Sequence, residues 1–271
     1  MNFIKIRKRI EKKIRPTSFL GFFIYNIYYN LFSFHKQIYF FYPRKNHYIG
    51  RLFVFKDRNY KFYLKSKSAI VFIYECYIKH LYDKFLKIRE GNIIIDCGAN
   101  AGLFSIYASN KVGEKGKIIS IEPEDKNFNN LKKNIKSNNI KNVIPINKGV
   151  YNKKTELNFY LSKEDFCHSL KNKNRNVSVK KIEVDTVENI LNKLKISFDK
   201  VDFIKLDVED SEFQALEGMK NILKKKRLKI IIPDIKYQDK DYFKIEKIIK
   251  NNDFKIKKEF LPKIHAIKGV N

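Results

Sequence analysis

The sequence has little of several residues that mark common classes of protein. It contains no tryptophan, 2 methionines, 3 cysteines, 6 prolines and 10 glycines among 271 residues. The cysteines, Cys76, Cys97 and Cys167, are odd in number, and their spacing matches neither a disulfide framework nor a zinc site. We therefore expect a reducing, cytoplasmic setting. Internal repeats and long linkers rich in Gly, Pro or Ser are also absent from the sequence.

A long uninterrupted apolar run is missing as well. A basic stretch at residues 4–15 precedes an aromatic-rich one, whose clean apolar runs fall far short of the roughly 20 residues of a membrane span. Four polar residues interrupt it: Asn26, Asn30, His35 and Lys36. No small-residue cleavage site of a signal peptide follows. Two interpretations of residues 1–47 remain: an amphipathic helix packed on the catalytic domain, or contact with a membrane surface.

Acidic residues are few beside the basic ones. The chain has 29 Asp+Glu against 57 Lys+Arg, a formal net charge of +28. This balance favours anionic partners, such as nucleic acid, a membrane surface or an acidic substrate. The base composition of an AT-rich genome would explain the excess without any functional meaning. We favour that second explanation because the lysines are spread along the whole chain rather than clustered.

Hydrophobic patterning predicts an α/β fold. Residues 48–64 have the pattern of a β-hairpin and 72–88 that of a helix. Strands are expected at 92–96, 117–123, 142–150, 155–162, 177–184, 201–209 and 228–235, and helices at 102–111, 125–137, 186–194, 211–225 and 239–251. An antiparallel pair, 253–260 and 263–270, closes the chain. The pattern predicts a doubly wound, Rossmann-like, mostly parallel sheet with an antiparallel C-terminal hairpin.

This pattern also suggests a division into domains. Residues 1–47 form a basic, aromatic-rich helical appendage in this interpretation. Residues 48–271 form the main domain, in which a hairpin and a helix (48–90) precede a Rossmann-like core (91–271).

The turn after the first core strand is the clearest motif. It reads Asp96-Cys97-Gly98-Ala99-Asn100-Ala101-Gly102, and in a doubly wound sheet this turn lies at the ligand-binding crevice. The two glycines allow a ligand to approach the backbone closely. The motif is not G-x-G-x-x-G, and an aspartate before the first glycine would repel a diphosphate and attract a cation. S-adenosylmethionine, which has a sulfonium and an ammonium but no phosphate, fits that demand.

A second acid supports this interpretation. Glu122 ends the second core strand, where an acidic side chain in nucleotide-binding sheets accepts hydrogen bonds from ribose hydroxyls. The alternative roles are structural: a helix N-cap for Asp96 and a solvated loop acid for Glu122. The two acids in this order favour a cofactor site made by Asp96, Gly98, Asn100, Gly102 and Glu122.

Three blocks in this order resemble the FkbM-type methyltransferases: IIIDCGANAGLFS (93–105), ISIEPEDKNFNNLKKNI (119–135) and VDFIKLDVEDSEFQALEGM (201–219). The resemblance covers about residues 70–255. It implies a class I methyltransferase fold and methyl transfer from S-adenosylmethionine, usually to a hydroxyl of a sugar or other small natural product. In the third block the family pattern is Lys-x-Asp-x-Glu-Gly-x-Glu, and Asp210 stands here in place of its glycine. The fifth strand ends IIIPDIK, without the Glu or Tyr-His often found there.

The candidate catalytic residues follow the fourth strand. Asp207 and Glu209 are expected there as general-base candidates, because neighbouring acids raise one another's proton affinity. His168 is a further candidate, in a polar insertion between two extended runs. Asp210 and Glu212 are interpreted as complementing the next helix N-terminus. Asp207 and Glu209 could share Mg²⁺, but nothing completes a coordination sphere, so no metal is predicted.

The expected activity is O-methylation of a glycan, a glycolipid or a similar polar small molecule, with no specific nucleic acid as partner. A basic N-terminus that brings the protein to an anionic membrane surface is a hypothesis from composition. Two alternatives stay open. One is an RNA-directed methyltransferase, although the Asn/Asp-Pro-Pro-aromatic turn of base amino-methylation is missing after the fourth strand. The other is a catalytically inactive protein that binds a membrane surface.

Overall fold

The computed structural model describes residues 38–41, 48–54, 58–64, 76–77, 81–161, 169–170, 178–233, 241–257 and 264–267. The chain divides into two compact units, Met1–Val71 and Phe72–Asn271. This division lies at a different place from the boundary between residues 47 and 48 that the sequence suggested.

The first unit contains a three-stranded antiparallel sheet of β1 (Ile38–Phe41), β2 (Tyr48–Val54) and β3 (Arg58–Leu64). Strands β2 and β3 form the predicted hairpin. β1 was not predicted, because residues 38–41 belonged to a segment interpreted as helical. The remainder of residues 1–47 lies outside the described residues.

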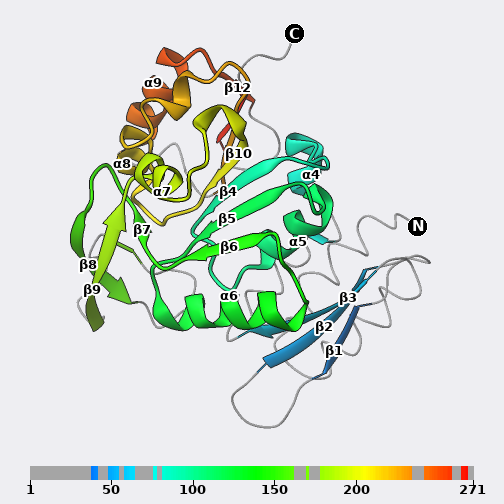
Figure 1. Cartoon of the computed structure of the whole chain (residues 1–271). Coiled ribbons are helices and arrows are strands. Elements are labelled where there is room, and N and C mark those ends of the chain that lie inside the picture. Colours follow the sequence, from blue (N-terminus) through cyan, green and yellow to red (C-terminus); the bar gives the residue numbers. More distant parts are fainter. Residues whose placement is uncertain are drawn as a thin grey trace, which may run out of the picture. The chain divides into compact units, whose positions relative to one another are not determined.

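The second unit is built on a seven-stranded sheet with the order β12-β13-β11-β10-β4-β5-β6 (Figure 1). Its five parallel strands are β4 (Ile93–Cys97), β5 (Lys117–Ile121), β6 (Val143–Ile146), β10 (Val201–Leu206) and β11 (Lys229–Ile232). Their sequences are almost continuous runs of β-branched residues, as expected for strands buried on both faces. Ile95, Ile119 and Ile204 are completely buried in the core.

The last two strands of the chain extend this sheet. β12 (Lys255–Lys257) and β13 (Ile264–Ile267) form the predicted antiparallel pair. β13 also pairs antiparallel with β11, so the strand that runs against the others lies between β11 and β12. The predicted antiparallel C-terminal hairpin is therefore confirmed, and β12, at the edge, runs in the direction of the parallel strands.

Helices alternate with these strands. They are α4 (Leu81–Leu86), α5 (Leu103–Val112), α6 (Asp125–Ser137), α7 (Val187–Lys193), α8 (Glu212–Glu217) and α9 (Tyr242–Asn251), with 3-10 turns η2 (Phe198–Lys200) and η3 (Ile222–Lys224). Figure 1 shows α6 along β6, and α8 beside α9 near the other end of the sheet. On α9 the buried residues are Tyr242, Ile245 and Ile249, spaced at three and four, so this helix buries one face. Helix α5 is buried almost all round, because eight of its ten residues are buried. Alternating strands and helices around a mostly parallel sheet confirm the predicted class I methyltransferase fold.

A second small sheet joins the core between β6 and α7. It consists of β7 (Gly149–Val150), β8 (Thr155–Leu161) and β9 (Ser178–Asp185), in the order β7-β9-β8. The sequence predicted a single strand over 142–150, but the structure breaks it. The side-chain amide of Asn147 donates hydrogen bonds to the backbone oxygens of Glu122 and Pro123, and the chain then leaves the main sheet.

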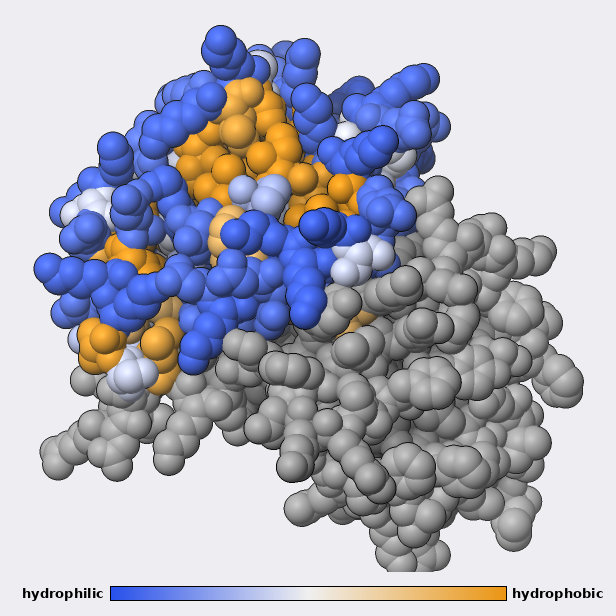
Figure 2. All heavy atoms as spheres, turned by 60° about the horizontal axis from the view of Figure 1, so that its bottom comes forward, coloured by the Kyte–Doolittle hydropathy of each residue, from blue (hydrophilic) through white to orange (hydrophobic). Residues whose placement is uncertain are grey.

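The surface shown in Figure 2 is largely hydrophilic, with apolar areas bordered by hydrophilic side chains. Among the described residues only two large hydrophobic side chains are exposed, Val179 and Phe243. No described helix has both the length and the apolar character that crossing a bilayer requires.

Candidate functional site

The strand order places the first core turn at a crevice. β4 pairs with β5 on one side and with β10 on the other, so successive connections leave β4 in opposite directions. In such sheets ligands bind beyond the carboxyl ends of the strands at this switch point. The segments that meet here are the turn after β4, the end of β5 and the turn after β10. These segments contain all the predicted site residues except His168.

The turn after β4 depends on its two glycines. Gly98 has φ +79° and Gly102 has φ +82°, a left-handed backbone that glycine adopts without steric cost. A Cβ on Gly98 would lie 1.8 Å from the backbone oxygen of Asp207, and one on Gly102 would lie 2.4 Å from Cδ1 of Leu131. The glycines therefore allow the turn to pack directly against the end of β10 and against α6.

Backbone hydrogen bonds hold the same turn in place. The N–H groups of Gly98 and Ala99 both donate to the carbonyl of Ile121, at 2.9 and 3.0 Å. From the other side, the N–H of Asp207 donates to the carbonyl of Cys97 at 3.0 Å. The three strand ends are thus fixed to one another before any ligand binds, which lowers the entropic cost of binding.

Asp96 lies inside this junction and is completely buried. One carboxylate oxygen is 3.2 Å from Nζ of Lys205, and the other accepts a hydrogen bond of 2.6 Å from Oγ of Ser105. Ser105 Oγ is also 2.6 Å from Oγ of Ser120. Both oxygens of Asp96 thus have partners within the protein, and its predicted contact with the methionine end of a cofactor stays a prediction.

Lys205 connects the first core turn to the turn after β10. Its buried ammonium lies 3.0 Å from Oδ2 of Asp207 and donates to the carbonyl of Gly98 at 3.3 Å. Burial alone would lower the pKa of Lys205, but the carboxylates of Asp207 and Asp96 outweigh it and raise that pKa. The sequence analysis gave Lys205 no role. The signal was present: a lysine inside an otherwise apolar strand needs a buried counter-ion.

Glu122 also lies at the junction, only 5% exposed. Its carboxylate accepts hydrogen bonds from the N–H of Asn100 at 2.8 Å and from the N–H of Glu124 at 2.9 Å. Burial raises the pKa of Glu122 to about 7; these two hydrogen bonds lower it, and the charges of Glu124 and Asp96 add to the increase. The structure thus joins two of the predicted cofactor-site residues directly, because Asn100 of the Gly98–Gly102 turn donates to Glu122.

The turn after β10 has an unusual backbone. Glu209 has φ +49° and Asp210 has φ +71°, although neither is glycine. Such residues cost about 1–2 kcal/mol each and persist where the surroundings hold them, often at functional sites. The buried Ser169, between β8 and β9, donates to the carbonyl of Glu209 and to Oδ2 of Asp210, at 3.1 and 3.0 Å. β10 therefore ends at Leu206, earlier than predicted, and its turn is fixed by the β8–β9 insertion.

Glu212 was interpreted from sequence as a residue that complements a helix N-terminus. In the structure it is 8% exposed, and its carboxylate accepts a hydrogen bond of 3.2 Å from the N–H of Val208. Burial raises the pKa of Glu212 to about 7, and the charges of Asp207 and Asp210 contribute to the increase. A carboxyl group with this pKa can accept a proton near neutral pH. Glu212 is therefore a base candidate that the sequence analysis missed.

His168 lies outside the described residues, although the next residue, Ser169, contacts the turn after β10. No group of His, Cys, Asp and Glu among the described residues is arranged to hold a metal ion. Side chains of Asp207 and Glu209 are half-buried at the end of β10, and the Asp207 side chain keeps 24% of its surface exposed.

Comparison with protein families gives one match, to the methyltransferase FkbM domain, over residues 96–256. That range contains the three strand ends described above, the small sheet and α9.

Two curated proteins match over shorter segments. The catalytic subunit TRM61 of tRNA (adenine(58)-N(1))-methyltransferase from Yarrowia lipolytica is 34% identical over 67 residues, which is 25% of this chain and 17% of that protein. Methyltransferase sdnD from Sordaria araneosa is 36% identical over 78 residues, 28% of this chain and 29% of that protein. The chain thus spans less than a third of the length of either relative.

Solved structures are similar at low sequence identity. An S-adenosylmethionine-dependent methyltransferase from Aquifex aeolicus has a TM-score of 0.45 and 17% identity, and the alignment covers 75% of this chain and 94% of the other. TYW2 from M. jannaschii, solved in complex with AdoMet, has a TM-score of 0.43 and 18% identity, with 86% and 90% covered.

Proposed function

The chain belongs to the FkbM family of methyltransferases, and we propose that it transfers a methyl group from S-adenosylmethionine to a hydroxyl of a sugar, a glycolipid or a similar polar small molecule. We further propose a cytoplasmic location, which the low number and unpaired spacing of the cysteines support.

The residues at the switch point fit the cofactor. The turn from Gly98 to Gly102 lies at the carboxyl edge where such sheets bind ligands, and Glu122 follows β5 at the same edge. We propose that the Glu122 carboxylate, which already accepts from the N–H groups of Asn100 and Glu124, also accepts from the ribose hydroxyls. Lys205 links the carboxylate of Asp207 to this turn, because its ammonium lies 3.0 Å from Oδ2 of Asp207 and donates to the carbonyl of Gly98. S-adenosylmethionine supplies an activated methyl group and a good leaving group, so the protein must supply alignment and a proton acceptor.

One observation carries the proposal: the ammonium of Lys205 bridges Asp96 under the cofactor turn and Asp207 at the end of β10. This bridge fixes a partly exposed carboxylate at the carboxyl edge of the sheet, next to where the methyl donor binds. A sugar hydroxyl is a poor nucleophile until its proton is accepted. Asp207 and Glu209 are the proposed residues for that step, with Glu212 close behind them.

An RNA acceptor is less well supported by the same turn. Negative charge is concentrated where an RNA phosphate backbone would have to pass, on Asp207, Glu209, Asp210 and Glu212. Phosphates are bound by basic side chains, so this acidic edge would repel an RNA acceptor. The name of the Yarrowia relative refers to tRNA, but its match covers 17% of that protein.

Calorimetric titration with S-adenosylhomocysteine, followed by transfer of labelled methyl groups to defined acceptors, tests the proposal. We expect the wild type to bind the cofactor product, and Glu122→Ala to lose that binding. The variants Asp207→Asn and Glu209→Gln should still bind S-adenosylhomocysteine. They should lose methyl transfer to the acceptors, which are supplied as a fraction of polar glycans and glycolipids. Asp125→Asn, an exposed carboxylate on α6, is the matched control and should retain both. Transfer to tRNA but to no glycan fraction would contradict the proposed acceptor class.

A further inference from the structure

Basic side chains are concentrated in the connection that leads to β11. Residues 218–233, which run from the end of α8 through β11, contain no acidic residue. They contain six basic ones: Lys220, Lys224, Lys225, Lys226, Arg227 and Lys229. Five of the six precede β11, so this positive charge collects near the amino ends of the strands.

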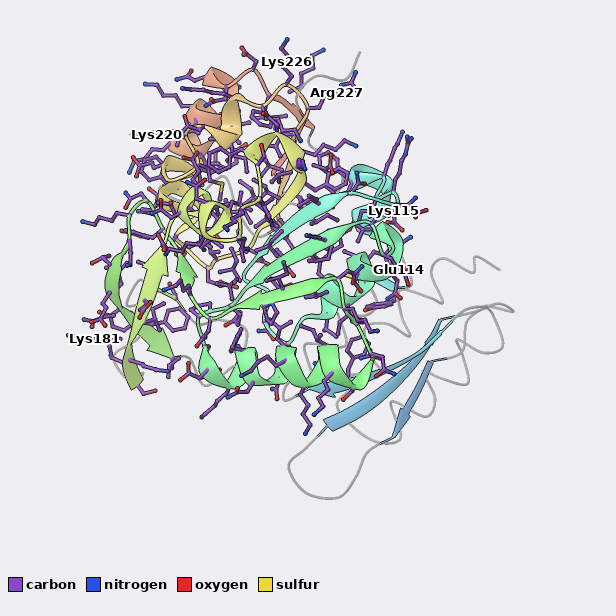
Figure 3. The ribbon with its side chains drawn as sticks, viewed as in Figure 1. Glu114, Lys115, Lys181, Lys220, Lys226 and Arg227 are labelled. Atoms are coloured by element: carbon purple, nitrogen blue, oxygen red, sulfur yellow. The ribbon has the colours of Figure 1, made fainter. Side chains whose placement is uncertain are left out.

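Four of these side chains are free to meet a partner. Lys220, Lys224, Lys226 and Arg227, here called the η3 cluster, are all exposed, and no carboxylate in the described ranges forms an ion pair with them. The other two point inward: Lys225 donates to the carbonyl of Val201, and Lys229 donates to that of Leu86 at 3.0 Å. Figure 3 shows Lys220, Lys226 and Arg227 projecting outward, on the side of this unit away from α6.

Neighbouring connections add to this positive edge. The contact between Lys229 and Leu86 brings the end of α4 to the start of β11, and the exposed Lys87 and Arg89 follow Leu86 directly. Exposed Lys200 precedes β10, the strand paired with β11. Two exposed acids, Glu90 and Asp199, lie in the same connections, so these connections contain three basic and two acidic exposed side chains. Some lysines elsewhere form ion pairs, for example Lys193 with Asp185 and Lys148 with Glu183.

The carboxyl edge has the opposite character. The segments after β5 and β10 contain seven acids, Glu122, Glu124, Asp125, Asp207, Glu209, Asp210 and Glu212, with a single lysine among them, Lys126. A polyanion is therefore attracted to the amino edge and repelled from these segments of the carboxyl edge. The η3 cluster is thus on the wrong side of the sheet to steer an acceptor into the site.

We propose that the η3 cluster, with Lys87, Arg89 and Lys200, docks the protein on an anionic lipid surface, with the carboxyl edge facing the water. Clusters of four to eight basic side chains are the usual size for recognition of acidic lipids. Residues 220–227 contain no aromatic side chain, so this segment offers no ring of its own on which a base could stack, the usual source of single-strand affinity. The docked face is thus separate from the cofactor edge, and the proposal does not depend on the acceptor.

Co-sedimentation of the full chain with vesicles tests this assignment. The probes are phosphatidylcholine vesicles with and without about 30% phosphatidylglycerol, at about 50 and 300 mM salt, where screening differs strongly. The test variant changes Lys220, Lys224, Lys226 and Arg227 to Gln. The matched control changes four other exposed lysines to Gln: Lys126, Lys132, Lys136 and Lys153. Circular dichroism and S-adenosylhomocysteine binding establish that both variants are folded.

We expect salt-sensitive binding to the anionic vesicles only, weakened at least about tenfold in the cluster variant and less than about twofold in the control. An equal loss in both variants would mean that net charge alone binds the membrane, and would overturn the assignment. Unchanged binding by the cluster variant would place the contact elsewhere in the chain and would also overturn it. The absence of any vesicle binding would also overturn the assignment. A third contrary outcome is that a single-stranded RNA probe binds more strongly than the vesicles at the same salt and that the cluster variant loses this RNA binding.

Discussion

Gly98 lies against Asp207 so closely that a Cβ atom on residue 98 would come within 1.8 Å of the backbone oxygen of residue 207. The turn proposed to receive the cofactor and the strand end with the proposed base are therefore in direct contact. A change in one must displace the other, because neither contact atom belongs to a flexible side chain.

Substitution of Gly98 by alanine tests this contact, and Gly91 supplies a matched control. Both have positive φ, +79° and +83°, but nothing lies within 4 Å of a Cβ on Gly91. We expect Gly91→Ala to lower the free energy of unfolding by about 1 kcal/mol, the cost of backbone strain alone. Gly98→Ala should cost more than about 3 kcal/mol and abolish S-adenosylhomocysteine binding. Equal costs in denaturant titrations would refute the close contact.

Removal of the Lys205 charge should leave a buried carboxylate unpaired. We expect Lys205→Met to lower the free energy of unfolding by about 3–5 kcal/mol, because Asp96 is fully buried and loses its counter-ion. Combining it with Asp96→Asn should recover part of that loss. A double-mutant cycle in urea measures the coupling, and strictly additive effects would show that the two residues do not interact.

The strained turn after β10 offers a third test. In a Ser169→Ala background, where the hydrogen bond to Asp210 is already lost, Asp210→Gly should stabilise the fold by about 1 kcal/mol, because glycine adopts φ +71° without strain. In the wild-type background the gain should be smaller, since Asp210→Gly also removes the acceptor of Ser169. Thermal unfolding of the wild type, Ser169→Ala, Asp210→Gly and the double variant measures both gains in stability. A gain from Asp210→Gly that is larger with Ser169 present would contradict this prediction.

The buried carboxyl of Glu212 predicts a pH dependence of stability. Because its pKa in the folded protein is about 7, against an ordinary value of 4.5, ionisation costs more in the folded than in the unfolded chain. The cost is absent below about pH 4.5, grows as pH rises, and is complete above about pH 7. Glu212→Gln should therefore be increasingly more stable than wild type across that range, by up to about 3 kcal/mol.

Denaturant titrations at pH 5 and pH 8 measure this difference. Glu114 is exposed, so Glu114→Gln is the control. We expect it to change the free energy of unfolding by the same amount at both pH values. A stability difference for Glu212→Gln that shrinks as pH rises would show that the glutamate is stabilised in its ionised form.

The sequence predicted the layers of the second unit well because they follow from local patterning. Short apolar runs predicted β4, β5, β10 and β11, and the glycine-bracketed turn after β4 was located before any coordinates. The errors arise where distant contacts decide the structure. The break between β6 and β7 depends on Asn147 bonding to the end of β5, which no local pattern encodes.

The site shows the same limit. Asp96, Glu122 and Asp207 were found from their places at strand ends. The partners of Lys205 were not, because Asp96 lies 109 positions away in the chain and meets it only through strand register. Nor did the pattern reveal that Asp210 adopts a left-handed backbone, since the support comes from Ser169, which lies 41 positions earlier in the chain, between β8 and β9.

The position of β13 has a consequence for biosynthesis. β13 follows both of its partners in the chain, and β12 has no other partner in the sheet. While a ribosome is still producing residues before Ile264, the outer edge of β11 is bare and β12 has nothing to join. This half of the sheet therefore stays incomplete until β13 inserts between β11 and β12. During that interval the exposed edge of β11 is the part of the sheet most prone to aggregation, and a chaperone would be needed most there.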